Sequence, residues 1–530
     1  MAAEGRLPVP VSRQGPLNRL AQLVGELLWA GRQEQALAAA DEFEPLVRAF
    51  GDDRTLGFLF QGRLFAHEDL DHIEDALAAG EVLLALRKAA GDVVGEAKTL
   101  ADVAGVYLRA GRLTEGMRYL ARAGMLLDHT TRRAGYYGVA LGTYAQAAQA
   151  AGLYEVAAAA SEREAEHYAV YGRVPGTFFE QIYITLLLIW GVRLDQLGHL
   201  HEAHSRLHRA TEIATNWLAA NADTELTDDA REIVALRALA LAKLGRTDQA
   251  IADAEPIVAA LRSRVFWLPA WAAHLALGIG RRAKGDLAAA RRELVAARQL
   301  AERSPEELRI AKYELAVLAS EVHGAEATAD LMEALSEHAR QLWQQRLHRV
   351  AMLHQARQRE ELEVEGMRAA AALLRDPLTG LGNRRQHDQL LREIDTGAVT
   401  LPVSLLVIDV DKFKSINDTH SHTVGDAVLC ALASVFRAHC RVGQDTALRY
   451  AGDEFTIVLN ANLEAAVEVA ERIRTAVALT DFEPIAPGTP ISISTGVAML
   501  RPGMTGADLF QAADTNLYQA KRGGRDRVAA

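Results

Sequence analysis

A pattern that returns about every forty residues constrains the fold of more than half of this chain. At each return a turn residue is followed, five positions later, by a small residue. The turn residues stand at positions 31, 71, 111, 152, 198, 245, 285 and 324, and all are glycine except Asp71. Glycine accepts the left-handed conformation that ends a helix, and a small residue lets the next helix pack closely. Because the surrounding sequence is rich in Ala and Leu with helical periodicity, residues 16–335 are predicted to form stacked helical hairpins.

This array resembles tetratricopeptide-type helical hairpins, with helices somewhat longer than those of the usual unit. The resemblance implies a superhelix whose concave groove holds a peptide, a partner protein or a small-molecule effector. The sequence identifies no such effector and gives no sign of whether it activates or inhibits. A plain helical spacer is the alternative interpretation. Residues 1–15, which precede the array, are expected to be flexible.

A helical connector is predicted over residues 336–375. Charged residues alternate there with Leu, Val and Met at near-heptad spacing, which is interrupted around residues 355–361. This spacing is typical of a dimerising coiled coil, and a solvated single helix is the alternative. Pro377 marks the end of the connector, because proline biases the preceding residue away from the helical conformation.

Charge and composition limit the function classes. The net charge of −11 over 530 residues argues against nonspecific binding to nucleic acid or to anionic membranes. The most apolar run, residues 182–192, is about half as long as a bilayer-spanning helix, so no membrane insertion is expected. Cys430 and Cys440 have a spacing that fits no metal-ligand pattern, and a disulfide framework is not expected. We therefore expect a cytoplasmic protein.

From Asp376 onward strand-like runs alternate with helices, as in an α/β or α+β fold. An apolar run at residues 403–409 predicts a central strand that ends in the carboxylates of Asp409 and Asp411. A second acidic cluster, Asp453 and Glu454, lies in the turn of a predicted hairpin. Carboxylates at the end of a buried strand are costly unless a cation, a proton or hydrogen bonds compensate them. The two clusters could converge on a single divalent metal site.

Several motifs of this region occur in an order that resembles the GGDEF family, the diguanylate cyclases, over about 155 residues. They are residues 376–385 (DPLTGLGNRR), 409–418 (DVDKFKSIND), His422 with Gly425-Asp426, 451–455 (AGDEF), and the series Ala513-Asp514, Leu517-Tyr518, Ala520-Lys521 and Gly524-Arg525. The resemblance implies an α/β GGDEF domain over residues 376–530, with a mainly antiparallel, palm-like sheet flanked by helices. It also implies condensation of two GTP into cyclic di-GMP with loss of two pyrophosphates. Each domain would hold one GTP, so the active form would be a homodimer.

The resemblance also implies a metal and catalytic set. Asp409 and Asp453 match the family's ligands for Mg²⁺ (or Mn²⁺), with the backbone carbonyl of Val410 joining them. Hard cations of this kind prefer oxygen ligands. Glu454 matches the neighbouring acidic position, where it would help to hold the metal and would position or deprotonate the 3′-hydroxyl.

The remaining matched residues would bind GTP. Backbone amides of Lys412, Phe413 and Lys414 would cradle phosphate oxygens. Lys521 and Arg525 match positions that reach the phosphates, and Asn417 and Asp426 match the pair that reads guanine. Read alone, these last four residues would be helix caps or a solvated helix end.

Three positions depart from the family pattern. Ala451 replaces the first glycine of the signature, and we expect activity to survive this change. Val442 stands where many relatives carry the arginine of an inhibitory product site, with Asp445 in place and Arg441 one residue out of register, so product inhibition is doubtful. Ser421 replaces a glycine, with a minor effect expected.

Two further function classes stay open from the sequence. One is a degenerate module that binds GTP or cyclic di-GMP without turnover and signals through a protein partner. The other is a scaffold in which the helical array is the function and the C-terminal domain only dimerises. Nucleotide binding without turnover would favour the first, and absence of nucleotide binding would favour the second.

Overall fold

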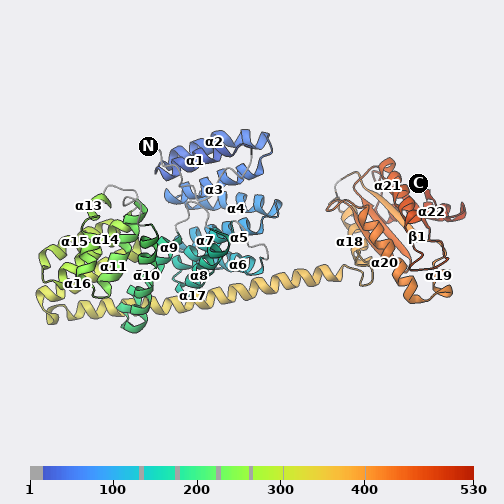
Figure 1. The fold of residues 1–530 in the computed structure, drawn as a ribbon. Coiled ribbons are helices and arrows are strands. Elements are labelled where there is room, and N and C mark those ends of the chain that lie inside the picture. The colour runs from blue at the N-terminus through green and yellow to red at the C-terminus, as the bar shows by residue number, and fades with distance from the viewer. Residues whose placement is uncertain are drawn as a thin grey trace. The chain divides into compact units, whose positions relative to one another are not determined.

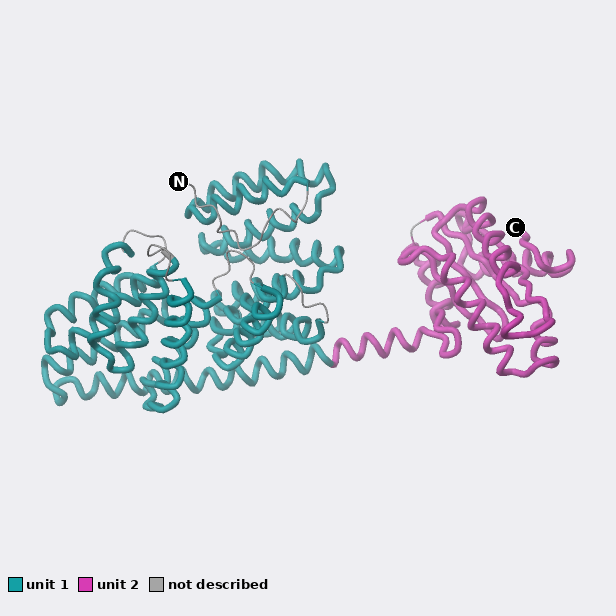
Figure 2. Tube along the Cα trace, in the orientation of Figure 1, with its two compact units in different colours: residues 1–361 teal, residues 362–530 magenta. Residues whose placement is uncertain are grey.

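The computed structural model describes residues 16–130, 136–172, 179–221, 228–261, 267–302, 304–399 and 401–530. The predicted flexible segment, residues 1–15, lies outside these ranges. The chain divides into two compact units, residues 1–361 and 362–530 (Figure 2). Within the described residues, no helix has both the length and the hydropathy that a bilayer crossing requires.

The first unit is built from helices that follow one another as hairpins (Figure 1). Its helices are α1 Asn18–Trp29, α2 Gln33–Ala49, α3 Asp53–Asp69, α4 Ile73–Ala89, α5 Val93–Arg109, α6 Leu113–His129, α7 Tyr137–Ala150, α8 Tyr154–Tyr171, α9 Phe179–Gln196, α10 Leu200–Ala220, α11 Asp228–Lys243, α12 Thr247–Ala254, α13 Val258–Leu261, α14 Trp267–Ala283, α15 Leu287–Leu300 and α16 Pro305–His323. The apolar run 182–192 lies within α9, where most of its side chains are buried in the core of the array.

All eight predicted turn residues have a positive φ, and Gly324, with ψ of 147°, differs from a left-handed helical turn. Their φ values run from 62° at Asp71 to 89° at Gly324. Gly51 and Gly91 end α2 and α4 in the same way, at turns that the forty-residue pattern does not include. The helical hairpins are therefore confirmed by their backbone.

The small residues that follow these turns are buried at seven of the eight positions. These are Ala36, Ala76, Gly116, Ala157, Ala203, Ala250 and Ala290. At Gly116 a Cβ atom would lie 2.7 Å from the Leu108 side chain, so the two helices approach too closely for alanine. The eighth position differs from the prediction, because Ala329 is exposed. The turn at Gly324 opens a long helix instead of a close-packed hairpin.

That helix, α17 Ala325–Leu373, runs without a break across the predicted boundary between residues 335 and 336. Its middle part packs on the first unit. Trp343 stacks on Tyr154 with ring centroids 6.4 Å apart, and Arg349 Nη1 donates to the carbonyl of Ala151 at 3.2 Å. Leu353 is buried in the core of the array. In contrast, Leu362, Met367 and Leu373 are between 61% and 65% exposed.

The second unit is a five-stranded mixed sheet with helices on both faces. Its elements are α18 Arg384–Asp395, β1 Ser404–Val410, α19 Phe413–Thr419, α20 His422–Ala438, β2 Thr446–Ala451, β3 Glu454–Leu459, α21 Leu463–Leu479, β4 Ile493–Met499, α22 Gly506–Arg522 and β5 Val528–Ala529. The strand order is β2-β3-β1-β4-β5, and neighbours are antiparallel except β4 and β5. The expected α/β fold with a mainly antiparallel sheet is confirmed.

Strand β1 is covered on both faces, which explains its continuous apolar run. Leu406 and Ile408 join a core that includes α20 and α21, whereas Leu405 and Val407 join a core that includes α22. Helix α22 lies very close to β4: a Cβ atom on Gly496 would lie 2.1 Å from the carbonyl oxygen of Ala513. This contact fixes the helix that carries Asp514 and Lys521.

Candidate active site in the C-terminal unit

The pairing of β1 with β3 brings the two acidic clusters together. Asp409 lies directly opposite Glu454 in the antiparallel register. The turn between β2 and β3 has two residues, and Gly452 takes its first position with φ of 53°. The backbone amide of Val410 donates to the carbonyl oxygen of Asp453 at 3.3 Å, which holds this turn against the end of β1. The convergence that the sequence predicted is thus a consequence of strand register.

The electrostatics of this cluster favour a cation. Burial raises the pKa of Asp409, and the nearby charges of Asp453 and Asp411 add to that rise, while Lys521 opposes it. Burial also raises the pKa of Glu454, with Asp409, Asp453 and Asp514 acting in the same direction. Lys521 Nζ lies 2.7 Å from Asp409 Oδ2. One ammonium group does not offset the cost of these carboxylates, since both pKa values stay raised. Carboxylate oxygens are ligands that a divalent ion such as Mg²⁺ prefers, and one or two of them suffice when substrate or water completes its shell.

Asp411 has a different role from its neighbour Asp409, and the sequence assigned it no role of its own. Its buried carboxylate accepts hydrogen bonds from the hydroxyls of Ser492 and Ser494, each at 2.7 Å, and from the amide of Asp526 at 3.0 Å. Arg525 Nε lies 4.0 Å away. Asp411 therefore ties the end of β1 to β4 and to the segment after α22. The serines lie about eighty residues away, so the local sequence carries no signal for this contact.

The loop after β1 leaves backbone donors free. Lys412 has φ of 56°, and its carbonyl accepts the amide of Ser415 at 2.8 Å. In the part of the chain that the structure describes, the amides of Lys412, Phe413 and Lys414 donate to no protein acceptor. Backbone amides are rarely left without a partner. Free amides at a helix start suit phosphate oxygens.

Gly425 lies next to both residues of the predicted guanine-reading pair, Asn417 and Asp426. Asn417 Oδ1 is buried and has no hydrogen-bond partner among the described residues. A Cβ atom on Gly425 would lie 2.0 Å from this oxygen, so only glycine leaves room for the amide. Asp426 follows Gly425 on α20 and is exposed. An orphaned buried acceptor beside an open carboxylate fits a ligand that offers donors.

The three departures from the family pattern have local explanations. Ala451 is exposed at the end of β2, and its φ lies outside the left-handed region, so its methyl group meets no strain. Ser421 caps α20, because its hydroxyl accepts the amide of Val424 at 3.3 Å. Arg441 folds back on Asp445 in a bidentate ion pair, with N–O distances of 2.9 Å and 2.8 Å, and Val442 is fully exposed.

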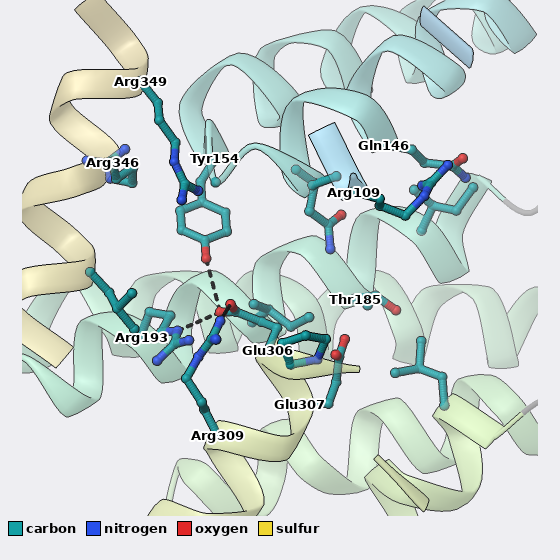
Figure 3. Close-up of a pocket in the computed structure, with 18 of the residues that line it drawn as sticks. Arg109, Gln146, Tyr154, Thr185, Arg193, Glu306, Glu307, Arg309, Arg346 and Arg349 are labelled. Carbon is teal, nitrogen blue, oxygen red and sulfur yellow. Dashed lines mark hydrogen bonds and ion pairs between the residues drawn. The ribbon is translucent and has the colours of Figure 1, made fainter. Parts of the chain in front are cut away.

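A cavity of about 760 Å³ lies inside the helical array (Figure 3). Arg193 and Arg309 both contact the carboxylate of Glu306, at 2.5 Å and 2.6 Å, and the Tyr154 hydroxyl donates to it at 3.3 Å. Burial raises the pKa of Glu307, beside this node, to about 7.

One wall of this cavity belongs to α17. The residues that α17 contributes are Ala339, Leu342, Trp343, Arg346 and Arg349. A second cavity of about 830 Å³ shares Trp29, Arg109, Gln146 and Ile182 with the first. A molecule bound in the first cavity would touch the helix that continues into the second unit.

Comparison with known proteins identifies the C-terminal domain. Residues 373–527 match the family model described as diguanylate cyclase, GGDEF domain. Diguanylate cyclase DgcM of Escherichia coli K12 is 37% identical over 185 residues, which are 34% of this chain and 43% of that protein. Diguanylate cyclase DosC of the same organism is 44% identical over 158 residues, which are 29% of this chain and 34% of that protein.

The coiled coil and GGDEF domain of DgcB from Caulobacter crescentus, solved in complex with cyclic di-GMP, is 29% identical to this chain. The match covers 34% of this chain and 97% of that one, with a TM-score of 0.31. The matched segments make up 43% of DgcM and 34% of DosC, so the chain spans less than half the length of either protein. Its C-terminal unit is a GGDEF diguanylate cyclase domain homologous to named diguanylate cyclases, and a large all-helical region precedes it.

Proposed function

We propose that this protein condenses two GTP into cyclic di-GMP and two pyrophosphates, as a homodimer regulated by its helical array. The observation that carries the proposal is the convergence of Asp409, Asp453 and Glu454 beside free donors at residues 412–414 and an orphaned acceptor at Asn417. Acidic, amide and acceptor groups together suit a metal-bound guanine nucleotide. The carboxylates without the free donors and the orphaned acceptor, or those groups without the carboxylates, would have a simpler structural explanation.

The metal ligands in this proposal are Asp409, Asp453 and the backbone carbonyl of Val410, with Mg²⁺ (or Mn²⁺) as the ion. The raised pKa of Asp409 supports the fit, because a cation would relieve the cost of its charge. When bound, the ion supplies charge neutralisation at the phosphates and acidifies the attacking hydroxyl. Glu454 would position or deprotonate the 3′-hydroxyl, and a raised carboxylate pKa makes it a stronger base.

The GTP contacts in this proposal divide by chemical group. The amides of residues 412–414 hold β- and γ-phosphate oxygens. Lys521 and Arg525 add cations beside them, and the 2.7 Å contact between Lys521 and Asp409 keeps that ammonium at the metal edge. Asn417 and Asp426 read guanine, because an amide and a carboxylate complement its acceptor and donor edge.

The homodimer follows from the chemistry of the product. One domain holds one GTP, so two 3′–5′ bonds need two domains facing each other. The exposed apolar residues Leu362 and Leu373, about three helical turns apart on one face of α17, support a helical dimer contact there.

Regulation by the array would act through α17. A peptide, protein or small-molecule effector in the cavity of Figure 3 would contact Trp343, Arg346 and Arg349 directly, and so would bias the helix that leads to the catalytic domain. We further propose a cytoplasmic location without nucleic-acid partners, on the charge argument given above.

Replacement of one metal ligand tests the assignment. Asp453→Ala should lower cyclic di-GMP formation from GTP and Mg²⁺ at least about a thousandfold, since metal stabilisation supplies several kcal/mol and about 1.4 kcal/mol is tenfold in rate. Circular dichroism should stay unchanged, because Asp453 lies in a turn that is partly exposed. Undiminished synthesis by this variant would remove the site assignment. GTP binding without turnover by the unaltered protein would instead favour the nonenzymatic binding module.

A further inference from the structure

The turn between α3 and α4 gathers two imidazoles and one carboxylate, far in sequence from the catalytic domain. His67 lies in the last turn of α3, His72 directly precedes α4, and Asp75 lies in its first turn. One ligand atom from each lies within 4.8 Å of the other two. Among the described residues, His67, His72 and Asp75 form the group of three His, Cys, Asp or Glu side chains whose ligand atoms all lie within 4.8 Å of one another.

The helical array provides its own comparison for His67. At seven of the eight turns, the residue four positions before the turn residue accepts, through its carbonyl, the amide that follows the turn, as His67 does from His72 at 2.8 Å. The equivalent positions hold Leu27, Tyr107, Ala148, Leu194, Leu241 and Arg281. Most of these are apolar, which suits a helix end that faces a neighbouring helix. An imidazole here departs from the repeat.

His67 also carries an unsatisfied group. Its Nδ1 atom is buried and has no hydrogen-bond partner among the described residues. A buried polar atom without a partner costs free energy, so such an atom calls for an explanation. The rings of His67 and His72 lie 5.8 Å apart between centroids, close enough for both to face one ion.

We propose that His67, His72 and Asp75 bind a borderline divalent transition metal ion of the Zn²⁺ class. Two imidazole nitrogens and one carboxylate oxygen form a common protein ligand set for such ions, with further positions left to water. Mg²⁺ prefers an all-oxygen shell, so this site is distinct in kind from the carboxylate cluster of the catalytic domain. Ligand atoms on a tetrahedral zinc ion are about 3.3 Å apart, so small side-chain rotations close the 4.8 Å spacing.

The surroundings permit entry and favour binding. His72 and Asp75 are exposed, so an ion reaches them from solvent. The imidazole of His67 is partly buried. Asp41 lies close enough to act on that ring, while Arg63 is held by Asp41 at 2.7 Å. A bound ion would join the end of α3 to the start of α4 and fasten this hairpin.

The test is Zn²⁺ titration of the full chain without nucleotide, with excess Mg²⁺ to occupy the carboxylate cluster. Competition with a chromophoric chelator should show one Zn²⁺ per chain that Mg²⁺ does not displace. His72→Ala and Asp75→Asn should each weaken this binding at least about tenfold, because each removes one of three ligands. Both residues are exposed, so these variants should fold, and unchanged thermal unfolding without zinc would verify it.

The matched control is the triple variant His201→Ala, His204→Ala, His208→Ala. These exposed imidazoles on α10 lie one helical turn apart and give the same opportunity for adventitious binding. The control should keep the tight site. Loss of binding in the α10 variant, binding that survives in both His72→Ala and Asp75→Asn, or no saturable binding would each overturn the proposal.

Discussion

Asp409, the proposed metal ligand, lowers the stability of the folded domain when its carboxylate is ionised. Its pKa is raised by burial and by neighbouring carboxylates, even though Lys521 lies 2.7 Å away. A carboxylate whose pKa is higher in the folded state than in the unfolded state destabilises the fold when ionised. Folding stability therefore rises as the pH falls through the raised pKa, and the cost is fully present at neutral pH.

Asp409→Asn should for this reason raise the unfolding temperature of the metal-free C-terminal unit at pH 7, by about 1–4 °C. The gain should shrink in acid, where the wild-type carboxyl is protonated. Scanning calorimetry of the full chain with and without Mg²⁺ and GTP checks both parts, because the ligands should stabilise the wild type and leave the variant unchanged. A variant less stable than the wild type at pH 7 would contradict the electrostatic account.

Gly425 gives a second residue-scale prediction. A Cβ atom there would lie 2.0 Å from Asn417 Oδ1, so Gly425→Ala must displace the amide that we assign to guanine. The Michaelis constant for GTP should rise at least about tenfold, the loss expected when a buried partner group is misplaced. Gly57→Ala in α3 is the matched control, because a Cβ atom there would meet only Leu83 Cδ1, at an ordinary contact distance of 3.5 Å. Steady-state kinetics should show no change in the control, and an equal effect of both substitutions would refute the positioning role.

At the scale of the element, helix-ending turns and buried strands were predictable from the sequence, whereas contacts between distant segments were not. The left-handed turns follow from helix-ending chemistry, so even Asp71 takes the glycine conformation, with φ of 62°. The strand β1 follows from an apolar run that needs two covered faces. The exposure of Ala329 was not predictable, because it depends on whether α17 stays beside α16. The contacts of Asp411 with Ser492 and Ser494 likewise depend on a strand pairing across eighty residues.

Helix α17 carries the prediction about assembly. The exposed side chains of Leu362 and Leu373 lie about three helical turns apart on one face of α17 and should both lie in the dimer contact. Replacing both with Glu should weaken dimerisation at least about tenfold through like-charge repulsion and lost burial. Cyclic di-GMP synthesis should fall in proportion, whereas GTP binding should stay unchanged. Leu331→Glu, on the first turns of the same helix and 50% exposed, is the control. Sedimentation equilibrium measures the effect, and an unaltered dimer would exclude this segment as the contact.

At the scale of the whole molecule, one helix is shared by two units of different character. Its middle part forms a wall of the array's cavity, and its last residues, from 362 onward, belong to the C-terminal unit. The array's sequence predicted a binding groove but no ligand, because cavity shape depends on side chains from α9, α16 and α17 together. The catalytic domain was predictable in more detail, because its motifs keep chemical groups at fixed positions along the chain. We propose that each chain carries half of an active site and that a second copy of the chain supplies the other half.

Product analysis over a range of chain concentrations tests that claim most directly. The 530-residue chain is incubated with GTP and Mg²⁺, and cyclic di-GMP and pyrophosphate are quantified at each concentration. We predict one cyclic di-GMP for every two pyrophosphates, with a rate per chain that rises with concentration until the dimer saturates. GTP that binds without turnover, or a rate per chain that stays constant under dilution to monomer, would contradict the account.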